Sequence, residues 1–556
     1  MIKILHRHFA FRAAKEVIAQ FPDEVEYTVE AGVTPSGKIH LGNFNDVVIA
    51  DAVLRALRKL GYTARGFLIV DSKDPFRKPP LFAPEEFRKE SSNYIGRPFT
   101  SVPDPWNCHE NYAVHFIDPV KEKLLEYGID IVVKWADEIH NDPNFIKALL
   151  NVLERREEVR VILNKVRSKA GHKSLYDKGW IPYRPWCKRC GRIDEKVVPL
   201  KAEGDKVYYE CKWCGYEGVA SISKAEGKPP WRVDWPLRWY VLHVNFEPLG
   251  KDHMASGSGY DTGSALIEKI FSRKPPVPIF YDFVYWVKRV NNEKKYFKFS
   301  KREGIGLGVD EWLEIAPPEV LRFMILKRDI TDIYSEALSH WEFDITMIPQ
   351  YVQEFDRLEA LYFEMTRKRR IREHSLIRDT YELSLTDGVP KERPKRLGYW
   401  QAVNVAAWMI DVKDGIEMLR KQGKLKGFSS DDIEDAKKRL KMASNWLLKV
   451  GYSVLLPSIE DFRSRYETLE DVERRAFSRI IRDIAKGLVN ENNIGEEIRE
   501  IAIELGLKSR KERLRIYKAF YRVLLNDESG PPLRRILAKK EFKEYLVKLS
   551  SLLFKT

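Results

Sequence analysis

Residues 25–71 alternate between strand-like and helix-like patterns, and this alternation constrains the fold more than any other feature of the sequence. Val25–Ala31 and Thr63–Val70 are β-prone, whereas Phe44–Leu60 carries apolar residues at helical spacing. Residues 34–43, between the first strand and the helix, contain a proline and two glycines, which is typical of a loop. We therefore predict a βαβ unit whose first loop lies outside the carboxyl end of a parallel strand, where open α/β sheets bind ligands.

Further strands are predicted near the end of the first 300 residues, so the sheet is interrupted by an insertion. Ile129–Lys134, Leu237–Phe246 and Val277–Trp286 have strand-like patterns, whereas residues 75–115 are Pro-rich and irregular. From about residue 312 onward the apolar residues follow a helical spacing. We expect one split α/β domain followed by a mostly α-helical region.

The chain is basic, with a formal net charge of +14 and a pI of about 9.2 spread along its length. This balance favours a polyanionic partner such as nucleic acid, although solvated basic faces would explain it equally well. The sequence contains no apolar stretch long enough for a membrane helix and no secretory signal pattern. We expect a cytoplasmic protein with no membrane partner, and its oligomeric state stays open.

Two Cys-x-x-Cys pairs, separated by 20 residues, have the spacing of a four-cysteine zinc ribbon. A glycine directly after each pair, Gly191 and Gly215, would let backbone amides approach the sulfurs. With all four positions filled by protein, the zinc would be structural, because catalytic zinc sites keep one position open. The predicted ligands are Cys187, Cys190, Cys211 and Cys214.

A second group of zinc-type ligands lies in the Pro-rich segment. Asp104, Cys108, His109 and His115 form an Asp-x3-Cys-His-x5-His arrangement. An irregular segment needs a clamp to order it, so we predict a second zinc site here. The alternative is a set of surface histidines beside one buried thiol.

The loop before the first helix has the composition of a phosphate site. A turn into a helix presents backbone N–H groups and a positive dipole end. His40 and Asn43 would add donors, Gly42 would let a nucleotide approach, and Pro35 and Gly37 would shape the turn, with Lys38 beside them. Taken alone, a histidine near a helix start is more often a cap or a packing residue.

A second loop, Lys298–Gly304, places two lysines around a serine. Lys298, Ser300 and Lys301 could close over a triphosphate and neutralise charge as pyrophosphate leaves. Taken alone, this run would be interpreted as a solvated Lys-rich turn.

In this order around an α/β domain, the two loops resemble the HIGH and KMSKS signatures of class I aminoacyl-tRNA synthetases. Asn43 stands where many members have His, and Phe299 stands where Met is usual. Both replacements keep the required property, because the Asn43 amide can donate hydrogen bonds and Phe299 can anchor the loop as an apolar residue. Within the class, the chain most resembles class I lysyl-tRNA synthetase, the mainly archaeal form. The resemblance rests on Ala31–Gly37, Trp231–Pro236, Phe246–His253 and Gly259–Gly263.

This resemblance implies a Rossmann-type catalytic domain, a zinc-containing insertion and a helical C-terminal anticodon-binding region. It implies ATP with Mg²⁺, L-lysine and tRNA(Lys) as substrates, and a lysyl-adenylate intermediate. The domains expected are residues 1–75 and 231–300 for the two catalytic halves, 76–230 for the insertion, 301–390 for the second signature loop and a helical linker, and 391–556 for anticodon binding.

The resemblance also implies an amino-acid site. Gly32, Thr34, Trp231 and His253 are expected to line it, and Asp234 or Asp252 could balance the ammonium charge of lysine. A glutamyl-type enzyme is the closest alternative and would need a pocket arginine, which Arg232 or Arg238 could supply. The other alternative is a non-catalytic zinc-ribbon RNA-binding protein with a degenerate synthetase core.

Overall fold

A computed structural model describes residues 7–290, 293–301, 303–328, 337–338, 340–371, 374–451, 456–507, 509–528, 530 and 532–554. The chain divides into two compact units. The first comprises Met1–Leu313 and Pro317–Arg393, and the second comprises Glu314–Ala316 and Pro394–Thr556. Each unit is described by itself.

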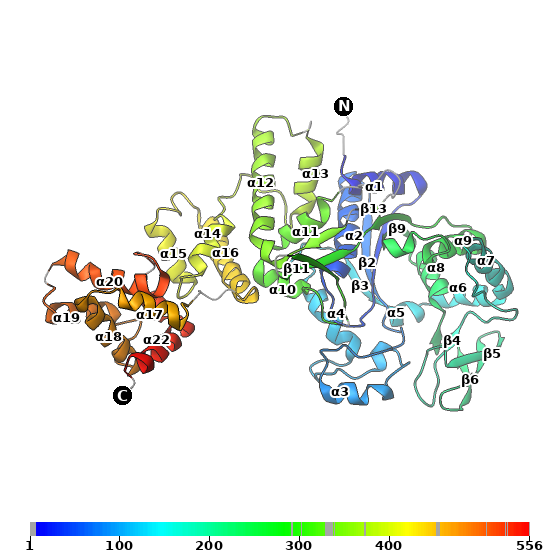
Figure 1. Ribbon diagram of the computed structural model, residues 1–556. Coiled ribbons are helices and arrows are strands. Elements are labelled where there is room, and N and C mark those ends of the chain that lie inside the picture. The colour runs from blue at the N-terminus through cyan, green and yellow to red at the C-terminus, as the bar shows by residue number, and fades with distance from the viewer. Residues whose placement is uncertain are drawn as a thin grey trace. The chain divides into compact units, whose positions relative to one another are not determined.

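A six-stranded parallel sheet forms the centre of the first unit, as Figure 1 shows. Its strand order is β13-β10-β9-β1-β2-β3. The strands are β1 (Tyr27–Val33), β2 (Ala64–Val70), β3 (Val132–Trp135), β9 (Val244–Gly250), β10 (Val277–Tyr281) and β13 (Ala337–Leu338).

The predicted βαβ unit is confirmed. Strand β1 pairs in parallel with β2 from Tyr27↔Ala64 to Val33↔Val70, and helix α2 (Leu41–Lys59) connects them. The chain adds β2 and β3 on one side of β1, then β9 and β10 on the other. The direction of strand addition therefore reverses between β1 and β9, which is where doubly wound sheets bind ligands.

Helix α2 is buried because it packs between the sheet and other helices. It contacts β1, β2, α1 (Phe9–Gln20) and α11 (Pro318–Leu326). Its apolar residues, among them Phe44, Val48 and Leu54, have no exposed surface. This packing holds the start of α2 against the carboxyl end of β1.

The strand predicted for Leu237–Phe246 is wrong in its first half. Trp231–Val241 forms helix α8, and β9 begins only at Val244. Trp, Val and Tyr in this segment are β-prone and Pro236 argues against a helix. Tertiary burial overrides these propensities because a helix sends Val233 and Leu237 into the core together.

The insertion contains several helices and a small antiparallel sheet, whose strand order is β5-β6-β7. One core extends from Phe67 and Ile69 of β2 through these helices to Cys187 and Cys211. The Pro-rich segment has a core of its own around Phe76 and Tyr112. The elements are α3 (Glu85–Glu90), α4 (Tyr112–Lys123), α5 (Ala136–His140), α6 (Pro143–Glu154), α7 (Arg156–Lys169), β4 (Arg184–Pro185), β5 (Val197–Glu203), β6 (Lys206–Cys211), β7 (Glu217–Ser221) and β8 (Gly227–Lys228).

After β9 the first unit continues with helix α9, a second small sheet and further helices. Strand β11 pairs with β12 in antiparallel and with β14 in parallel orientation. The elements are α9 (Gly259–Phe271), β11 (Val284–Val290), β12 (Glu293–Lys298), α10 (Val309–Ile315), β14 (Trp341–Phe343), α12 (Ile348–Arg367) and α13 (Ser375–Ser384).

In the described part of the second unit every regular secondary-structure element is a helix, as the sequence predicts. A core of buried apolar residues, among them Phe477, Ile516 and Leu549, holds its last helices together. The helices are α14 (Tyr399–Ala406), α15 (Val412–Lys421), α16 (Ser430–Lys449), α17 (Ile459–Glu467), α18 (Asp471–Ala485), α19 (Ile494–Glu504), α20 (Arg510–Leu525), α21 (Leu533–Leu537) and α22 (Lys540–Leu553). Throughout the described part of the chain, every helix is too short or too polar to span a membrane.

A buried arginine ties α11 to the sheet domain. Arg322 has no exposed surface, and its guanidinium donates to Asp51 of α2 at 2.6 Å and to the Leu383 carbonyl at 2.7 Å. It also donates to the Tyr127 carbonyl at 3.3 Å. One side chain therefore connects four separate segments of the first unit.

We expect Arg322→Ala to lower the stability of the first unit by about 3–5 kcal/mol, because it leaves buried acceptors and a buried carboxylate without this partner. Lys89→Ala breaks an exposed ion pair with Glu85 and is the control, with an expected change of about 0.5 kcal/mol or less. Thermal and urea unfolding of both variants measures the difference. Equal unfolding midpoints would contradict this role for Arg322.

Candidate functional site

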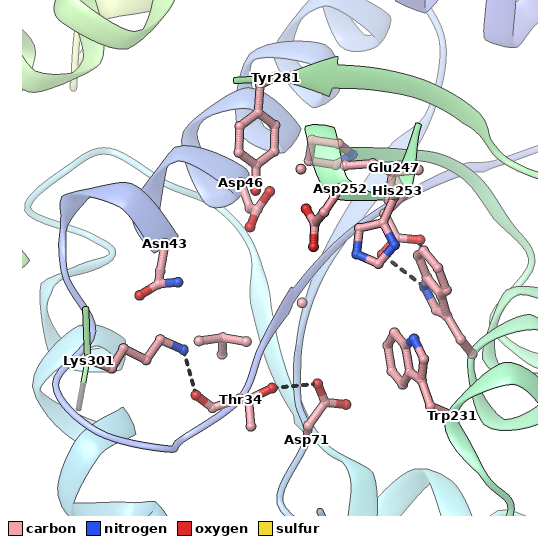
Figure 2. A pocket seen from close by; sticks show the side chains of 16 residues that line it. Thr34, Asn43, Asp46, Asp71, Trp231, Glu247, Asp252, His253, Tyr281 and Lys301 are labelled. Carbon is pink, nitrogen blue, oxygen red and sulfur yellow. Dashed lines mark hydrogen bonds between the residues drawn. The ribbon is translucent and has the colours of Figure 1, made fainter. Parts of the chain in front are cut away.

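A pocket of about 360 Å³ opens where the strand order reverses (Figure 2). Its walls come from the carboxyl ends of β1, β2, β9 and β10, from the first turns of α2 and α8, and from both signature loops. The lining residues are Gly32, Val33, Thr34, Asn43, Asp46, Asp71, Trp231, Trp235, Glu247, Pro248, Leu249, Gly250, Asp252, His253, Tyr281 and Lys301.

A second pocket, of about 520 Å³, adjoins the first one. It lies at the N-terminus of α2, where backbone N–H groups and the helix dipole favour an anion. The residues that line both pockets are Thr34, Asn43, Gly250, Asp252, Tyr281 and Lys301. The remaining lining residues of the second pocket are Ser36, His40, Gly42, Phe283, Val284, Lys298, Phe299 and Ser300. The first pocket is therefore continuous with a site suited to phosphates.

The two signature loops are in direct contact, although they are about 260 residues apart in the sequence. The Lys301 ammonium donates to the Thr34 carbonyl at 2.7 Å, and the Leu41 N–H donates to the Leu307 carbonyl at 3.0 Å. The contact requires glycine at position 37, because a Cβ there would lie 2.7 Å from the Lys301 carbonyl oxygen. Phe299 packs against His40 with ring centroids 5.2 Å apart.

The sequence left open whether His40 caps a helix or donates a hydrogen bond to phosphates, and its geometry is compatible with both roles. Its Nδ1 accepts the Asn43 N–H at 3.3 Å, so His40 is the N-cap of α2. Burial and the nearby Lys301 charge lower the pKa of His40 to about 3. The ring is therefore neutral near pH 7, and with Nδ1 as acceptor, Nε2 carries the proton and is a hydrogen-bond donor.

The second loop contributes two lysines in different environments. Lys298 is exposed and its ammonium lies 3.5 Å from the centre of the Phe283 ring. Lys301 is more enclosed, and burial lowers its pKa to about 8 while Asp71 and Asp46 act in the opposite direction. Ser300 closes the turn by exchanging backbone hydrogen bonds with Ile305. Arg302, the last residue of this signature, lies outside the described residues.

The residues predicted for ATP fall into two groups. His40, Gly42, Asn43, Lys298, Ser300 and Lys301 line the larger pocket. Pro35, Gly37 and Lys38 do not line it. Lys38 forms an ion pair with Glu311 of α10 at 2.7 Å, so it braces the loop from behind. The Asn43 side-chain oxygen is buried and has no hydrogen-bond partner, which leaves an acceptor for a ligand.

The residues predicted for the amino acid also fall into two groups. Gly32, Thr34, Trp231, Asp252 and His253 line the smaller pocket. Asp234 does not, because it lies behind the wall with no exposed surface. Its carboxylate is held by Arg238 at 2.8 Å, His140 at 2.8 Å and Lys228 at 3.1 Å. Asp234 therefore has enough cationic partners of its own.

Four further polar residues line the smaller pocket without having been identified from the sequence: Asp46, Asp71, Glu247 and Tyr281. Asp71 directly follows β2, and a carboxylate just after a predicted parallel strand was a signal that could have located it. Its carboxylate accepts from Arg238 at 2.7 Å and from the Thr34 hydroxyl at 3.2 Å. The Asp46 carboxyl group is hydrogen-bonded to the Tyr281 side chain, and burial raises the pKa of Asp46 to about 7.

The smaller pocket is lined by more acidic than basic side chains. Its described lining residues include Asp46, Asp71, Glu247 and Asp252, one lysine, Lys301, and no arginine. Arg232 donates instead to the Ser258 carbonyl at 2.8 Å and the Thr262 hydroxyl at 2.8 Å. Arg238 is buried between Asp234 and Asp71. The pocket is thus suited to a cationic ligand, and neither candidate arginine is available for an anionic one.

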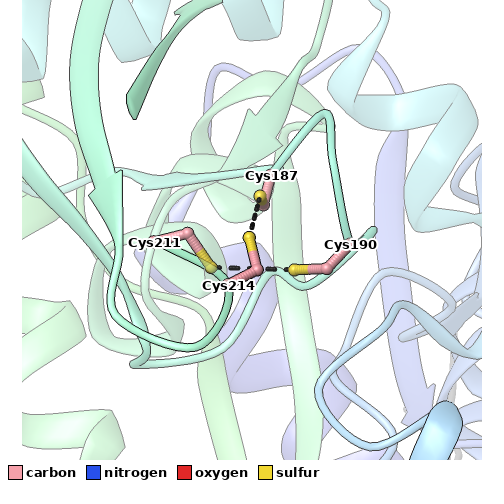
Figure 3. Close-up of side chains that lie close together, drawn as sticks. All are labelled: Cys187, Cys190, Cys211 and Cys214. Carbon is pink, nitrogen blue, oxygen red and sulfur yellow. Dashed lines mark hydrogen bonds between the residues drawn. The ribbon is translucent and has the colours of Figure 1, made fainter. Parts of the chain in front are cut away.

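The four cysteines predicted as a zinc ribbon converge in space (Figure 3). Their sulfurs lie within 4.8 Å of one another, and the Cys187–Cys214 and Cys190–Cys211 pairs are each 3.6 Å apart. A tetrahedral zinc with Zn–S bonds of about 2.3 Å places its sulfurs about 3.8 Å apart. The four thiols therefore have the chemistry and the spacing of a zinc site.

The loops that carry these cysteines repeat the same geometry. Gly191 and Gly215 have φ values of +74° and +68°, and each donates its N–H to the backbone carbonyl oxygen of the first cysteine of its pair, which closes the turn. The backbone N–H groups of Arg192 and Tyr216 point to the sulfurs of Cys190 and Cys214. Such N–H donors stabilise thiolates and hence a bound cation.

The second predicted cluster also converges. One ligand atom from each of Asp104, Cys108, His109 and His115 lies within 4.8 Å of all the others. The Cys108 sulfur is 3.1 Å from His109 Nδ1 and 3.3 Å from His115 Nδ1. Asp104 is buried and accepts the backbone N–H groups of Cys108 and His109, which fixes the loop around it. These donors also fit zinc.

Comparison with known proteins agrees with this geometry over the whole chain. The family model described as tRNA synthetases class I (K) matches residues 7–387. The lysine–tRNA ligase of Methanocaldococcus jannaschii is 34% identical over 555 residues, covering 98% of this chain and 99% of that protein. The lysine–tRNA ligases of Methanococcus maripaludis and Thermococcus kodakarensis are 33% and 32% identical, covering 95% and 97% of this chain and 97% and 98% of those proteins. The chain belongs to the class I (K) family of tRNA synthetases.

Proposed function

We propose that this protein is a class I lysine–tRNA ligase, which activates L-lysine with ATP and transfers it to the terminal ribose of tRNA(Lys). The observation that carries the proposal is the acid-lined pocket beside the contact between the two signature loops. The full-length similarity to archaeal proteins named lysine–tRNA ligase supports it. The charge of the pocket supports lysine as the amino acid.

Adenylate formation on this site requires positioning and charge neutralisation. The lysine α-carboxylate attacks the α-phosphorus of ATP, a lysyl-adenylate forms, and pyrophosphate leaves. Neutral His40 donates from Nε2, and Lys298 and Lys301 supply positive charge to the phosphates. This assignment agrees with a site that lacks a nucleophile activated by a neighbouring base.

Mg²⁺ would add positive charge to the phosphate oxygens when bound with ATP. Mg²⁺ is usually held by substrate phosphates, waters and one or two carboxylates. Asp252 fits that requirement because its carboxylate is exposed and lines both pockets. Asp252 is therefore a candidate for either the metal or the amino acid.

The smaller pocket would bind the lysine side chain between aromatic and acidic groups. Trp231 stacks on Trp235 with ring centroids 4.9 Å apart, and these rings offer a surface for the aliphatic stem. An ammonium near an indole face gains about 0.5–2 kcal/mol. Glutamate is disfavoured, because Arg232 and Arg238 bind protein groups and the lining is acidic.

The helical second unit is proposed to bind the anticodon region of tRNA. The insertion is proposed to contact other parts of the tRNA. The net charge of +14 supports a polyanionic partner. Binding should then weaken steeply with salt. The domain limits and the cytoplasmic location expected from the sequence stay predictions.

We also propose structural zinc at Cys187, Cys190, Cys211 and Cys214 and a second zinc at Asp104, Cys108, His109 and His115. The convergence of four suitable ligand atoms at each site supports both assignments. In each case all four tetrahedral positions come from protein, so the ions would fix loops. The second zinc would order the Pro-rich segment beside the site.

Pyrophosphate exchange tests the amino acid. We expect lysine to support exchange and glutamate to fail, because the pocket lining is acidic. The assay is run with and without tRNA, so that a tRNA requirement for activation is not mistaken for inactivity. If neither amino acid supports exchange under both conditions, the proposed activity is wrong.

His40→Ala should lower the rate of adenylate formation by about 10²–10³-fold, the typical cost of losing one donor to a developing charge. It also removes the N-cap of α2, worth about 1 kcal/mol. His40→Asn keeps a capping acceptor but lacks the imidazole donor, so it separates the two roles. Rapid-quench kinetics measures the rate of adenylate formation in both variants. If both rates equal that of the wild type, His40 has no role in this step.

Metal analysis tests the zinc assignments. We expect about two zinc ions per chain in the wild type, given two clusters of four ligands each. Cys108→Ser should lose one ion and keep the other, whereas Cys211→Ser should lose the ribbon zinc and part of the stability of the insertion. If the Cys108→Ser protein binds as much zinc as the wild type, the assignment of the second zinc site is wrong.

A further inference from the structure

Glu247 of β9 lies in the wall of the smaller pocket (Figure 2). Two tryptophans of α8, Trp235 and Trp239, hold its carboxylate. The Trp235 indole N–H lies 3.1 and 3.0 Å from the two carboxylate oxygens, and the Trp239 indole N–H donates to Oε2 at 2.6 Å. Glu247 is only 6% exposed, and Trp239 has no exposed surface. Because the tryptophans are four residues apart on one helix, both donors point to the same side.

The rings fit against α9 through two glycines with the same spacing. A Cβ on Gly259 would lie 3.0 Å from Cζ3 of Trp235, and a Cβ on Gly263 would lie 2.9 Å from Cζ3 of Trp239. Both distances are too short for any side chain larger than hydrogen without displacing a ring. The Gly259–Gly263 motif of the sequence thereby obtains a physical role, which is to seat the two indoles.

Glu247 differs from Asp71 and Asp252 in its partners. Asp71 is paired with the Arg238 guanidinium, and Asp252 is exposed to solvent. Asp46, like Glu247, has a neutral partner, the Tyr281 hydroxyl, but only Glu247 is held by two indole N–H groups. Among the ion pairs of the described residues, none involves Glu247. Indole N–H groups are neutral, so they orient the carboxylate and stabilise its ionised form without cancelling its charge.

The surroundings of Glu247 favour an incoming cation. Burial and the nearby Glu30 carboxyl raise the pKa of Glu247 well above its ordinary value, whereas Trp239 and Trp235 act in the opposite direction. Glu30 is itself buried, and its Oε2 has no hydrogen-bond partner. A buried carboxylate without a cation is costly, and a bound ammonium group removes that cost.

We propose that Trp235 and Trp239 are positioning residues that hold the Glu247 carboxylate as the anion for the side-chain ammonium of the amino-acid substrate. This inference rests on the proposed lysine activation. Specificity then comes from donors that leave the negative charge in place. An arginine in their position would orient Glu247 equally well but would neutralise it, and the pocket would lose its preference for a cation.

Trp239→Phe removes one indole N–H and keeps an aromatic ring. We expect the KM for lysine in pyrophosphate exchange to rise by about 10-fold or more, as for a lost hydrogen bond to a buried charge. The kcat and the KM for ATP should stay within about two-fold of the wild type, because the nucleotide pocket is not lined by Trp239. Trp235→Phe should act in the same direction.

Trp312→Phe is the matched control. Trp312 is also fully buried in the first unit, and its indole N–H donates to the Pro317 carbonyl at 3.0 Å, away from both pockets. Glu247→Gln retains the shape but removes the charge, and its KM for lysine should rise by more than that of either tryptophan variant. If Trp239→Phe unfolds below the assay temperature, the KM for lysine of Glu247→Gln still tests the inference.

The inference is overturned if Trp239→Phe raises the KM for lysine no more than Trp312→Phe, or if Glu247→Gln keeps the wild-type KM. It is also overturned if kcat and both KM values change together, since that pattern indicates a general structural defect. A wild type without lysine-dependent exchange would instead reject the proposed activity. The two failures are therefore distinguishable.

Discussion

The adjacency of β1 and β9 is the constraint on which the functional architecture depends. Strands are added to one side of β1 early in the chain and to the other side after the insertion, so the carboxyl ends of β1, β2, β9 and β10 meet at one edge. Helix α2 starts at this edge and supplies an N-terminus for an anion. Both pockets form here because the sheet leaves a crevice where its order reverses.

The two pockets differ in electrostatic character, although Asp252 and Lys301 line both of them. Two lysines and helix N–H groups line the larger pocket, whereas most charged side chains of the smaller one are carboxyl groups. The boundary between them is Thr34, whose carbonyl accepts from Lys301 and whose hydroxyl donates to Asp71. Thr34 thereby hydrogen-bonds to a cation on one side and to a carboxyl group on the other, without a direct ion pair between Lys301 and Asp71.

Buried charges behind the pocket have a structural role distinct from that of the lining. Asp234, Arg238 and Lys228 neutralise one another behind the wall, and Arg238 also pairs with Asp71, which lines the pocket at the end of β2. Such networks are costly to break, because each deletion leaves another buried charge alone. Glu247 is bound by neutral indoles instead, and that difference separates a carboxylate available to a ligand from one that is already matched.

The sequence by itself determined those features that depend on neighbouring residues. Alternating strand and helix patterns predicted the βαβ unit, and the cysteine spacing predicted the converging thiols. The contact between the two signature loops agrees with their assignment to one site, and their role toward phosphates stays a prediction. The prediction from sequence failed at α8, where β-prone aromatics form a helix because burial outweighs propensity. Only the tertiary structure decided which carboxylates face the pocket. Asp234 lies behind the wall, whereas Glu247, on the buried strand β9, lies in it. Side-chain direction depends on how β9, α8 and α9 pack together, and neither composition nor spacing encodes contacts between segments so far apart in the chain.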